Sequence, residues 1–526
     1  MMILEITGEA ILRNCPDELI DRITATLRIE SPEVDVARRL LRQAGVSQGE
    51  AVEYMDAEEH MDFGSIYKGI RRTVKDRIER GMMRPMSRTK IHSYIQRVTA
   101  SVTKARGESR YLDLSVPVDG GVSFPRALAA RMKRICEEVG ALEIRDKRDP
   151  GEVLACESKI KLRDYQKEPV GLAVRRNGLI VAPCGSGKTV MAAEAIARLG
   201  RWAIVVVHQI EHAEQWAAEI TGLLGVETGV VGDGRREWAP ITLALPKTLG
   251  RLDVPRGYGV LVVDEVHHIP AETCREAAGA CRAYRRIGLT ATLERKDGLT
   301  PVIKWIMGPV IAEVTHSRLY DDGYLMRCVV KKAHISDITA AEEEEIGVDP
   351  TEEPSLYLSK LVSLPRRRQE VVEVIADTLP GRAAALALCG RVPQCEALAR
   401  DLRAAGISAA AAHGKTSKKD RSEALRRLDE GDLRVLCAVN IADENLNITR
   451  LDTAYLCAPF RAARKAIQRI GRTMRPMCGK NQPEIYDILD GQKIGTMPGV
   501  LKSQWRSRRR AYLDIEAKIC TYKKQS

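Results

Sequence analysis

Short apolar runs alternate with amphipathic stretches through the middle and C-terminal parts of this 526-residue chain. Apolar runs of about four to eight residues between polar, Gly or Pro residues are typical of strands buried on both faces of a parallel sheet. The stretches between them have helical spacing, and the one over residues 188–199 ends at Gly200, a helix stop signal. The pattern predicts strands at 178–182, 203–207, 260–263, 286–289, 384–388, 434–439, 453–457 and 484–489.

An acidic, proline-containing run at residues 341–354 interrupts this alternation and indicates a solvated linker or surface insertion. Residues before the first parallel-sheet pattern differ, with helices expected at 17–27 and 32–44 after a first strand. The expected fold class is therefore α/β: an N-terminal mixed α/β accessory domain, a first parallel-sheet domain, a linker, a second parallel-sheet domain and a basic C-terminal helix. Their expected bounds are 1–150, 151–322, 323–366, 367–495 and 496–526.

Basic residues outnumber acidic ones, and their excess is uneven. The chain has 83 Lys or Arg and 71 Asp or Glu, a net charge of +12. Residues 461–526 hold 16 Lys or Arg against 5 Asp or Glu, and residues 71–110 hold 12 against 3. This distribution indicates a polyanionic partner. Trp505 lies in the most basic stretch, 502–510, and is expected to be available for stacking; a solvated helix that closes the second domain is the alternative.

Composition excludes several other classes of protein. The 13 cysteines include no C-x-x-C pair, which excludes a zinc ribbon and favours reduced cysteines in the core. No apolar stretch reaches the ~20 residues of a membrane-spanning helix, and the N-terminus has acids where a secretory signal has Lys or Arg. We therefore expect a cytoplasmic protein with no membrane partner.

A nucleotide-binding motif follows the first strand of the middle region. The loop Pro183-Cys184-Gly185-Ser186-Gly187 leads into Lys188-Thr189 and an alanine-rich helix, and this succession is the context that a P-loop requires. Backbone N–H groups of such a loop surround phosphates, so larger side chains would obstruct it. We expect Lys188 to reach the β- and γ-phosphates of ATP and the Thr189 hydroxyl to bind Mg²⁺. Ala182 stands where the motif has its first glycine.

A second acidic element completes this predicted site. The apolar strand at 260–263 delivers Asp264 and Glu265 at its carboxyl end, where open α/β sheets bind ligands. Asp264 is expected to hold Mg²⁺, and Glu265 to orient and deprotonate the attacking water.

These residues are similar to the motifs of a known family. Asp264-Glu265-Val266-His267-His268 resembles the DExH box of superfamily 2 helicases, and the resemblance extends over residues 155–480 or so. It implies two RecA-like domains that hydrolyse ATP with Mg²⁺. The segment Leu162-Arg163-Asp164-Tyr165-Gln166 looks like the adenine-binding segment of that family, which implies that Arg163 and Gln166 lie at the base.

Two further motifs follow in the family's order. Gly288-Leu289-Thr290-Ala291-Thr292 resembles the motif that couples hydrolysis to nucleic-acid binding, which implies nucleic-acid contacts for Thr290 and Thr292. The sequence QRIGRTMR from Gln468 to Arg475 matches Q-x-x-G-R-x-x-R. Arg472 and Arg475 would lie on one side of a helical turn, and as arginine fingers at the γ-phosphate they would contribute about 10³–10⁵ in rate. A basic helix that faces DNA or solvent is the alternative.

The segment 435–448 departs from the family's usual pattern. Val439, Asn445 and Asn447 stand where Thr, Gly and Asp are usual, whereas Glu444 is retained. Glu444 and Asn447 stay among the residues expected at the nucleotide, because Asn447 loses its charge but keeps its hydrogen-bonding groups. Leu293 replaces a usual proline, and these changes are expected to alter coupling or strand preference.

Within superfamily 2, the chain most resembles the XPB-type and phage UvsW-like DNA helicases. The similarity lies in Trp216 within HQIEHAEQW, in TLERKDG at 292–298 and in residues 308–325. It implies translocation on single- or double-stranded DNA, unwinding or remodelling of forks and junctions, a role in DNA repair or recombination, and the host cytoplasm as location if a phage encodes the chain.

The composition is consistent with a protein that follows the sugar–phosphate backbone. Aromatic residues make up only 4% of the chain, too few for extensive base stacking. Backbone contacts by basic side chains, with Arg506, Arg508, Arg509 and Arg510 as candidates, predict little sequence specificity and a steep salt dependence. Residues 71–110 are a second candidate surface for duplex DNA; a helical segment with a solubilising face is the alternative.

The expected function is that of an ATP-dependent DNA helicase or translocase that acts on forked or branched DNA. Two alternatives remain: an RNA helicase with the same ATP chemistry, since no motif reads the 2′-hydroxyl, and a DNA-binding scaffold with an uncoupled ATPase. A nuclease is disfavoured because no further acidic cluster has two-metal character. Protein partners are not indicated by any motif.

Overall fold

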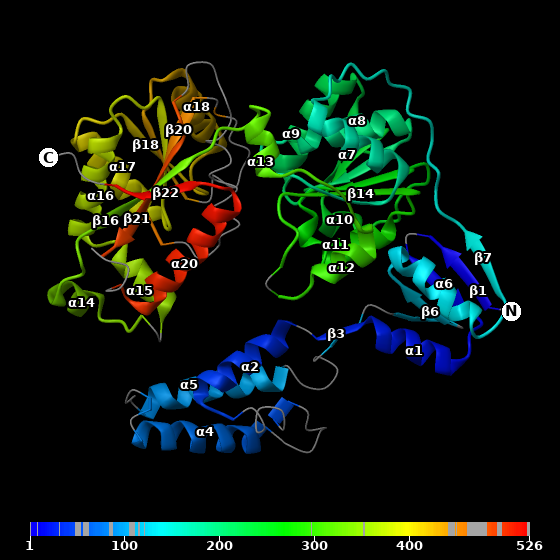
Figure 1. Cartoon of the computed structure of the whole chain (residues 1–526), viewed down its shortest axis with the longest axis horizontal. Helices are drawn as coiled ribbons and strands as arrows, with labels where there is room; N and C mark the ends of the chain where they lie inside the picture. The colour runs from blue at the N-terminus through cyan, green and yellow to red at the C-terminus, as the bar shows by residue number, and fades with distance from the viewer. Residues whose placement is uncertain are drawn as a thin grey trace.

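The computed structural model describes a large part of the chain, arranged as two parallel-sheet lobes side by side and an N-terminal region (Figure 1). The described residues are 2–7, 9–30, 32–47, 54–55, 63–80, 82–83, 88–104, 111–113, 116–119, 121–295, 297–350, 353–439, 448, 450–459, 481–491 and 497–522. We call the two lobes lobe 1 and lobe 2 in chain order. None of the helices within these ranges has the length and apolar composition needed to cross a membrane.

Lobe 1 contains an eight-stranded sheet with helices packed around it. Its strands are β8 (Gly178–Val181), β9 (Ala203–Val206), β10 (Thr228–Gly232), β11 (Arg235–Arg236), β12 (Ile241–Ala244), β13 (Val260–Val263), β14 (Arg285–Thr290) and β15 (Val310–Glu313). Its helices are α7 (Asp164–Arg175), α8 (Lys188–Leu199), α9 (Ile210–Leu224), α10 (Pro246–Leu249), η3 (Val266–His268), α11 (Glu272–Ala280) and α12 (Thr300–Met307). The strand order is β11-β10-β12-β9-β13-β14-β8-β15, parallel throughout except for the β10–β11 pair. Because β8, β13 and β14 are neighbours, their carboxyl ends share one edge of the sheet.

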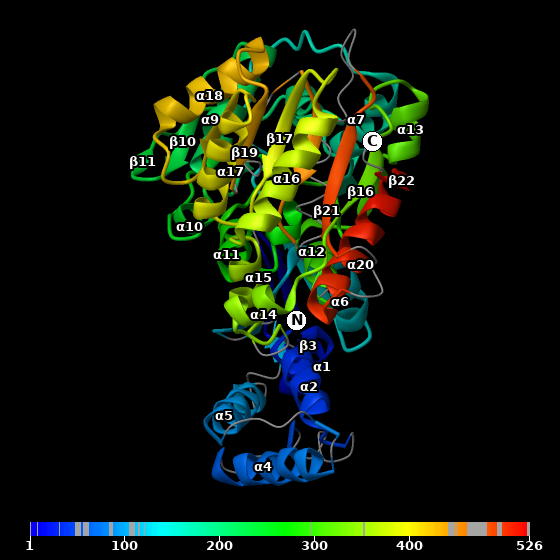
Figure 2. The ribbon, with the colours of Figure 1, turned by 90° about the vertical axis from the view of Figure 1, so that its left-hand side faces the viewer.

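Lobe 2 contains a seven-stranded sheet in which all the paired strands run parallel. Its strands are β16 (Val329–Ile335), β17 (Ala384–Leu388), β18 (Ala409–Ala412), β19 (Val435–Ala438), β20 (Leu451–Leu456), β21 (Glu484–Asp490) and β22 (Lys518–Thr521). Its helices are α14 (Ala340–Ile346), α15 (Pro354–Leu361), α16 (Pro365–Thr378), α17 (Val392–Ala404), α18 (Lys418–Glu430) and α20 (Gly499–Asp514). The order is β18-β19-β17-β20-β21-β16-β22, and Figure 2 shows β16 beside β21.

The predicted linker at 323–366 is wrong in one respect, because part of it belongs to the second sheet. It contains β16, which joins the second sheet because its apolar side chains at Val330, Ala333 and Ile335 are buried there. The acidic run within it is partly helical, since Thr339 and Glu342 cap the first turn of α14 reciprocally. Lobe 2 therefore begins before the acidic run and not after it.

The connection between the lobes contacts both of them. It contains α13 (His316–Asp321), between β15 and β16. Tyr320 donates its hydroxyl to the Ile515 carbonyl at 2.7 Å, at the end of α20 in lobe 2. Tyr324 packs edge-on against Tyr165 of lobe 1, with ring centroids 5.0 Å apart. These two contacts, four residues apart in the chain, connect α13 to lobe 2 and the residues just after α13 to lobe 1.

The N-terminal region consists of a small sheet and a separate group of helices. The sheet strands are β1 (Met2–Ile6), β2 (Ala10–Arg13), β5 (Val116–Val118), β6 (Gly121–Phe124) and β7 (Leu142–Asp146), in the order β5-β6-β2-β1-β7. With α1 (Asp17–Leu27), η2 (Arg126–Leu128) and α6 (Ala129–Glu137) they form what we call the N-terminal sheet. The helical unit is formed by α2 (Pro32–Ala44), α4 (Phe63–Glu79) and α5 (Arg88–Lys104), with the short pair β3 (Arg28–Glu30) and β4 (Tyr111–Asp113) before and after it.

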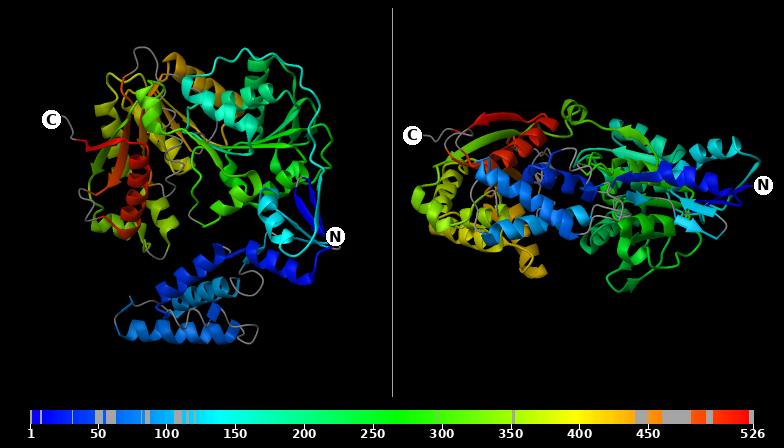
Figure 3. Two further views of the ribbon diagram at one scale, coloured as in Figure 1. Left: turned by 45° about the vertical axis from the view of Figure 1, so that its right-hand side comes forward. Right: turned by 90° about the horizontal axis from the view of Figure 1, so that it is seen from below.

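These two parts differ in how they relate to lobe 1. The buried side chains of the N-terminal sheet, such as Leu4 and Phe124, form one apolar cluster with those of lobe 1, such as Val206 and Leu261. The helical unit has an apolar cluster of its own and stands away from the lobes (Figure 3). The expected accessory domain is thus two structural parts, of which only one shares the core of lobe 1.

Candidate nucleotide-binding site

The loop after β8 has the backbone shape that phosphate binding requires. It runs from Ala182 to Gly187 and leads directly into α8 at Lys188. Gly185 and Gly187 have φ angles of 84° and 72°, in the left-handed region that favours glycine. A Cβ atom on Gly187 would lie only 2.7 Å from the Gln166 side-chain nitrogen. Glycine at this position therefore lets the loop pack against the start of α7 and leaves its N–H groups accessible.

Lys188 lies at the first turn of α8, next to the two predicted carboxylates. Its ammonium group donates to the Ala182 carbonyl at 3.3 Å. Burial by itself lowers the pKa of this group, but the nearby Cys184, Glu265 and Asp264 outweigh burial and raise it. The group is therefore charged at neutral pH, as a phosphate ligand must be.

Asp264 and Glu265 follow β13 at the same edge of the sheet. The Asp264 carboxylate accepts hydrogen bonds from the Trp216 indole at 3.1 Å and from the Glu265 backbone N–H at 2.9 Å. Burial, and then the adjacent Glu265 carboxylate, raise the pKa of Asp264. Burial also opposes the charge of Glu265, but His267 and Lys188 outweigh it and lower the pKa of Glu265 to about 2. A cation at Asp264 would relieve this crowding of negative charge.

Glu265 also has an unusual backbone conformation. Its φ of 44° and ψ of 51° lie in the left-handed region, which a non-glycine residue enters at a cost of about 1–3 kcal/mol. It stands at the turn between β13 and η3, so this strain aims its side chain toward Lys188 and His267.

A chain of contacts leads from Glu265 to the Thr-Ala-Thr segment after β14. The Glu265 carboxylate lies 3.2 Å from His267 Nδ1, and the same nitrogen lies 3.2 Å from the Thr290 hydroxyl. Thr290 in turn donates to the Thr292 carbonyl at 2.8 Å. Thr290 is fully buried, so the expectation that its side chain contacts nucleic acid is wrong: its hydroxyl is used inside the protein. Thr292 is half-buried, and its nucleic-acid contact stays a prediction.

The first turn of α7 supports the phosphate loop from the other side. Gln166 is buried and donates its amide to the Ser186 carbonyl at 2.9 Å, and Tyr165 donates to the same carbonyl at 2.8 Å. Arg163 is exposed, with its guanidinium 4.4 Å from the centre of the Tyr324 ring. Gln166 thus positions the loop, and a contact of either predicted residue with a base stays a prediction.

The residues at this edge fit a magnesium-bound nucleoside triphosphate. The Ser186 hydroxyl is buried and has no hydrogen-bond partner within the described ranges. Thr189 follows Lys188 in the first turn of α8, and Asp264 is held from two sides at the neighbouring strand end. Thr189 and Asp264 would hold Mg²⁺, whereas the loop of Pro183, Cys184, Gly185, Ser186 and Gly187 would surround the phosphates.

Several predicted site residues of lobe 2 lie outside the described residues. These are Glu444, Asn447, Gln468, Arg472 and Arg475. Their roles at the nucleotide stay predictions. Val439, just before them, is described and is buried at the end of the β19 segment.

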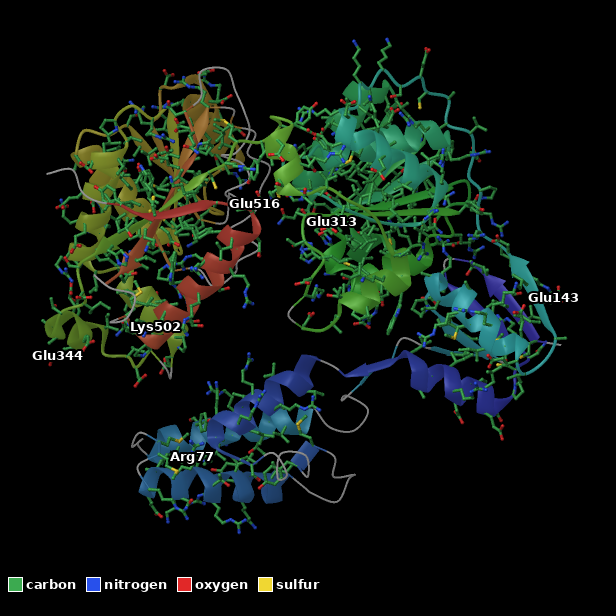
Figure 4. All side chains as sticks on the ribbon, in the orientation of Figure 1. Arg77, Glu143, Glu313, Glu344, Lys502 and Glu516 are labelled. Carbon is green, nitrogen blue, oxygen red and sulfur yellow. The ribbon has the colours of Figure 1, made fainter. Side chains whose placement is uncertain are left out.

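The basic helix α20 has two different faces, with Lys502 near its start and Glu516 just beyond its end (Figure 4). Arg508 is only 2% exposed and pairs with Asp487 at 2.9 Å, and Trp505 is buried as well. The predictions that Arg508 contacts DNA and that Trp505 is available for stacking are therefore wrong, because both side chains face the lobe 2 core. The outer side of α20 carries three exposed arginines, Arg506, Arg509 and Arg510.

Two residues of the site were not predicted as site residues from the sequence. Trp216 had been noted only as a point of family resemblance, yet it binds the Asp264 carboxylate. His267 was quoted only as a letter of the DExH box, yet it links Glu265 to Thr290. For His267 the available signal was its place two residues after Glu265, whereas no local pattern relates Trp216 to Asp264.

A phosphate-binding loop and an acidic strand end in one parallel-sheet lobe, followed by a second such lobe, are the arrangement of a P-loop nucleotide-binding protein. Two family models match: "Type III restriction enzyme, res subunit" over residues 159–295, and "Helicase conserved C-terminal domain" over residues 369–477. By these matches and the relatives described next, the chain is similar to the XPB-type branch of superfamily 2 helicases.

Individual relatives agree with this assignment. A putative DNA 3′-5′ helicase Rad25 of Haloarcula marismortui is 29% identical over 69% of this chain and 58% of its own length. A DNA 3′-5′ translocase XPB2 of Sulfurisphaera tokodaii is 25% identical over 60% of this chain and 79% of its own. The chain thus spans less than two thirds of the Haloarcula protein.

A solved structure shows the same fold. It is the ATP-dependent Type ISP restriction-modification enzyme LlaBIII bound to DNA, with a TM-score of 0.54 and 14% identity over 75% of this chain and 34% of that one.

Proposed function

We propose that the protein is an ATP-dependent DNA helicase or translocase that unwinds or remodels forked or branched DNA. The observation that supports this most directly is the chain of contacts from Glu265 through His267 to Thr290, with Glu265 close enough to Lys188 to raise the pKa of its ammonium group. It links the expected phosphate site to the segment expected to sense nucleic acid. The relatives named as DNA 3′-5′ helicases and translocases support DNA as the polymer.

In this proposal each residue of lobe 1 has a defined role. Lys188 binds the β- and γ-phosphates, and Thr189 and Asp264 hold Mg²⁺, which neutralises the charge that develops on the transferred phosphoryl group. Glu265 orients the attacking water. Its low pKa keeps the carboxylate ionised, so that it can accept a hydrogen bond from the water, but makes it a weak proton acceptor. Gln468, Arg472 and Arg475 complete the site from lobe 2, so hydrolysis requires the lobes to approach each other.

DNA would be held by backbone contacts from two basic surfaces. One is the exposed side of α20 with Arg506, Arg509 and Arg510. The other is the outer side of α4, where Arg71 and Arg72 are exposed. Such contacts are independent of base sequence, and each lowers log K by about 0.7–0.9 per log unit of salt.

The test combines ATP hydrolysis with strand displacement. ATPase activity is measured with single-stranded DNA, duplex DNA and RNA, and displacement with 3′-tailed, 5′-tailed, forked and four-way DNA. Lys188→Ala should abolish both activities, whereas Lys167→Ala, an exposed lysine on α7, should change neither. Stimulation by RNA alone would favour the RNA helicase, and DNA-stimulated hydrolysis without displacement would favour the uncoupled scaffold.

A further inference from the structure

A cavity lies where the N-terminal sheet meets lobe 1. Its volume is about 370 Å³, and it is lined by Leu4 and Ile6 of β1, by residues of η2 and α6, by Ile144 of β7 and by residues 306–309 of lobe 1. Asn177 and Pro309 on its wall immediately precede β8 and β15. The cavity is therefore at the amino-terminal edge of the lobe 1 sheet, whereas the P-loop lies at the carboxyl-terminal edge.

The charged side chains of the cavity are all cationic, and Asn177 is a neutral polar residue on its wall. Arg126, Lys133, Arg148 and Arg286 line it, and none of its lining residues within the described ranges is acidic. Arg148 is paired with Asp146 just outside, and Lys133 lies 3.5 Å from Glu137 at the rim. Arg286, which is 2% exposed, donates to the backbone carbonyls of Ile306, Ala278 and Cys281, and these bonds hold its position.

Arg126 has a hydrogen-bond donor that no described residue uses. It is 6% exposed, and one of its terminal nitrogens, Nη1, donates to the Ala283 carbonyl at 2.6 Å and to the Thr7 carbonyl at 3.3 Å. Its other terminal nitrogen, Nη2, is buried and has no hydrogen-bond partner in the part of the chain that the structure describes. Burial, and then the like charge of Arg286, lower the pKa of Arg126 to about 8. A buried guanidinium with an unused donor is a costly arrangement unless an anion completes it.

We propose that this cavity binds the phosphate group of a ligand about the size of a nucleotide. Arg126 and Arg286 would hold the phosphate from the cavity floor, and Lys133 would approach it from the rim. Four cationic side chains without a lining acid favour a multiply charged phosphate over a singly charged carboxylate. Ile6, Ile144 and Met307 provide an apolar wall for the organic part of the ligand. The phosphate can belong to a free nucleotide or to the 5′ end of a DNA strand.

The inference does not depend on the proposed helicase function, because the cavity and the P-loop lie at opposite edges of the sheet. The binding experiment uses the full chain with Lys188→Ala, which weakens phosphate binding at the P-loop. Calorimetric titrations with AMP, adenosine, a 5′-phosphorylated oligonucleotide and its 5′-hydroxyl form separate the two sources. We expect AMP, the phosphorylated oligonucleotide or both to bind more tightly than the matching probe without phosphate.

Three further substitutions, each made in the Lys188→Ala protein, test whether the phosphate probes bind in this cavity. Lys133→Glu, at the rim, should weaken the phosphate-dependent binding about tenfold or more. Arg126→Met, which keeps the buried methylene stem, should do the same if it folds. Arg131→Glu, on the exposed side of α6, should leave it unchanged. Failure of both phosphate probes to exceed their controls, or equal binding with and without Lys133→Glu, would overturn the inference.

Discussion

Trp216 donates its indole N–H to the Asp264 carboxylate over 3.1 Å and so connects α9 to the end of β13. The other carboxylate oxygen accepts the Glu265 backbone N–H at 2.9 Å. Asp264 is thereby fixed in orientation before any cation arrives. Partners of this kind, one step removed from a metal, typically contribute about 10–100-fold to metal affinity or activity.

Trp216→Phe should raise the Mg²⁺ concentration needed for half-maximal ATPase activity about tenfold, because the ring is kept but the hydrogen bond to Asp264 is lost. A Mg²⁺ titration of the ATPase rate at saturating ATP measures this. Trp202→Phe is the matched control, since the Trp202 ring packs near Tyr258 at 5.8 Å, away from the acids. An unchanged Mg²⁺ requirement in Trp216→Phe would show that the indole does not orient Asp264.

His267→Ala should separate ATP hydrolysis from its stimulation by DNA. The imidazole is the contact between Glu265 and Thr290, so its removal should reduce the stimulation about five- to 150-fold, the usual range of coupling between sites. Basal hydrolysis without DNA should fall less. The two rates are measured over a DNA titration. His268→Ala, at the exposed neighbouring position, serves as the control, and equal losses in both variants would contradict the role assigned to His267.

Substitutions of Arg508 and Arg509, which are neighbours in the sequence, should affect different properties of the protein: stability for Arg508 and DNA binding for Arg509. Arg508→Ala leaves the buried Asp487 carboxylate without its ion pair and should lower the free energy of unfolding by about 3–5 kcal/mol. Arg509→Ala should change stability by less than about 0.5 kcal/mol and reduce the salt slope of DNA binding by about one unit. Denaturant unfolding and DNA titrations at several salt concentrations measure the two effects. Similar unfolding curves for both variants would contradict the burial of Arg508.

The stability of lobe 2 should depend on pH through Glu342. The Arg366 side chain, as the largest cause, lowers the pKa of Glu342 from 4.5 to about 2. The folded carboxylate binds fewer protons than the unfolded one, so its contribution is complete above pH 4.5 or so and is lost as the pH falls toward 2. Glu342→Gln should therefore destabilise the protein at pH 7 and have little further effect near pH 2.

Urea unfolding at a series of pH values from 7 to 2 or so tests this dependence. Glu344→Gln is the matched control, because Glu344 is exposed on the same helix, α14 (Figure 4). A constant difference between Glu342→Gln and the wild type over the whole range would mean that the ion pair with Arg366 does not set the pKa.

The sequence predicted the central strands well because each is a continuous apolar run. Four strands of lobe 1, β8, β9, β13 and β14, agree with the predicted bounds to within one residue at each end. β16 was missed because Lys331 and Lys332 interrupt its apolar character and only its pairing with β21 explains it. β22, with Lys518 in it, was missed for the same reason.

The site was predictable where its residues are contiguous and unpredictable where they meet only in the fold. The loop up to Thr189 and the pair Asp264 and Glu265 follow from local motifs. The bond between Trp216 and Asp264 joins residues 48 positions apart, and no local pattern specifies it. The basic stretch of α20 could not be divided into inner and outer residues either, because Asp487, on a strand before the helix, decides that Arg508 turns inward.

The apolar cluster that the N-terminal sheet shares with lobe 1 has a mechanical consequence. A force applied to the N-terminal sheet reaches lobe 1 through buried packing and through the bond from Arg126 to Ala283. A displacement of lobe 1 therefore carries the N-terminal sheet with it. Removing the residues before Asp149 would take away apolar side chains that pack on the sheet of lobe 1. The N-terminal sheet is therefore a structural part of lobe 1 and not a separable domain.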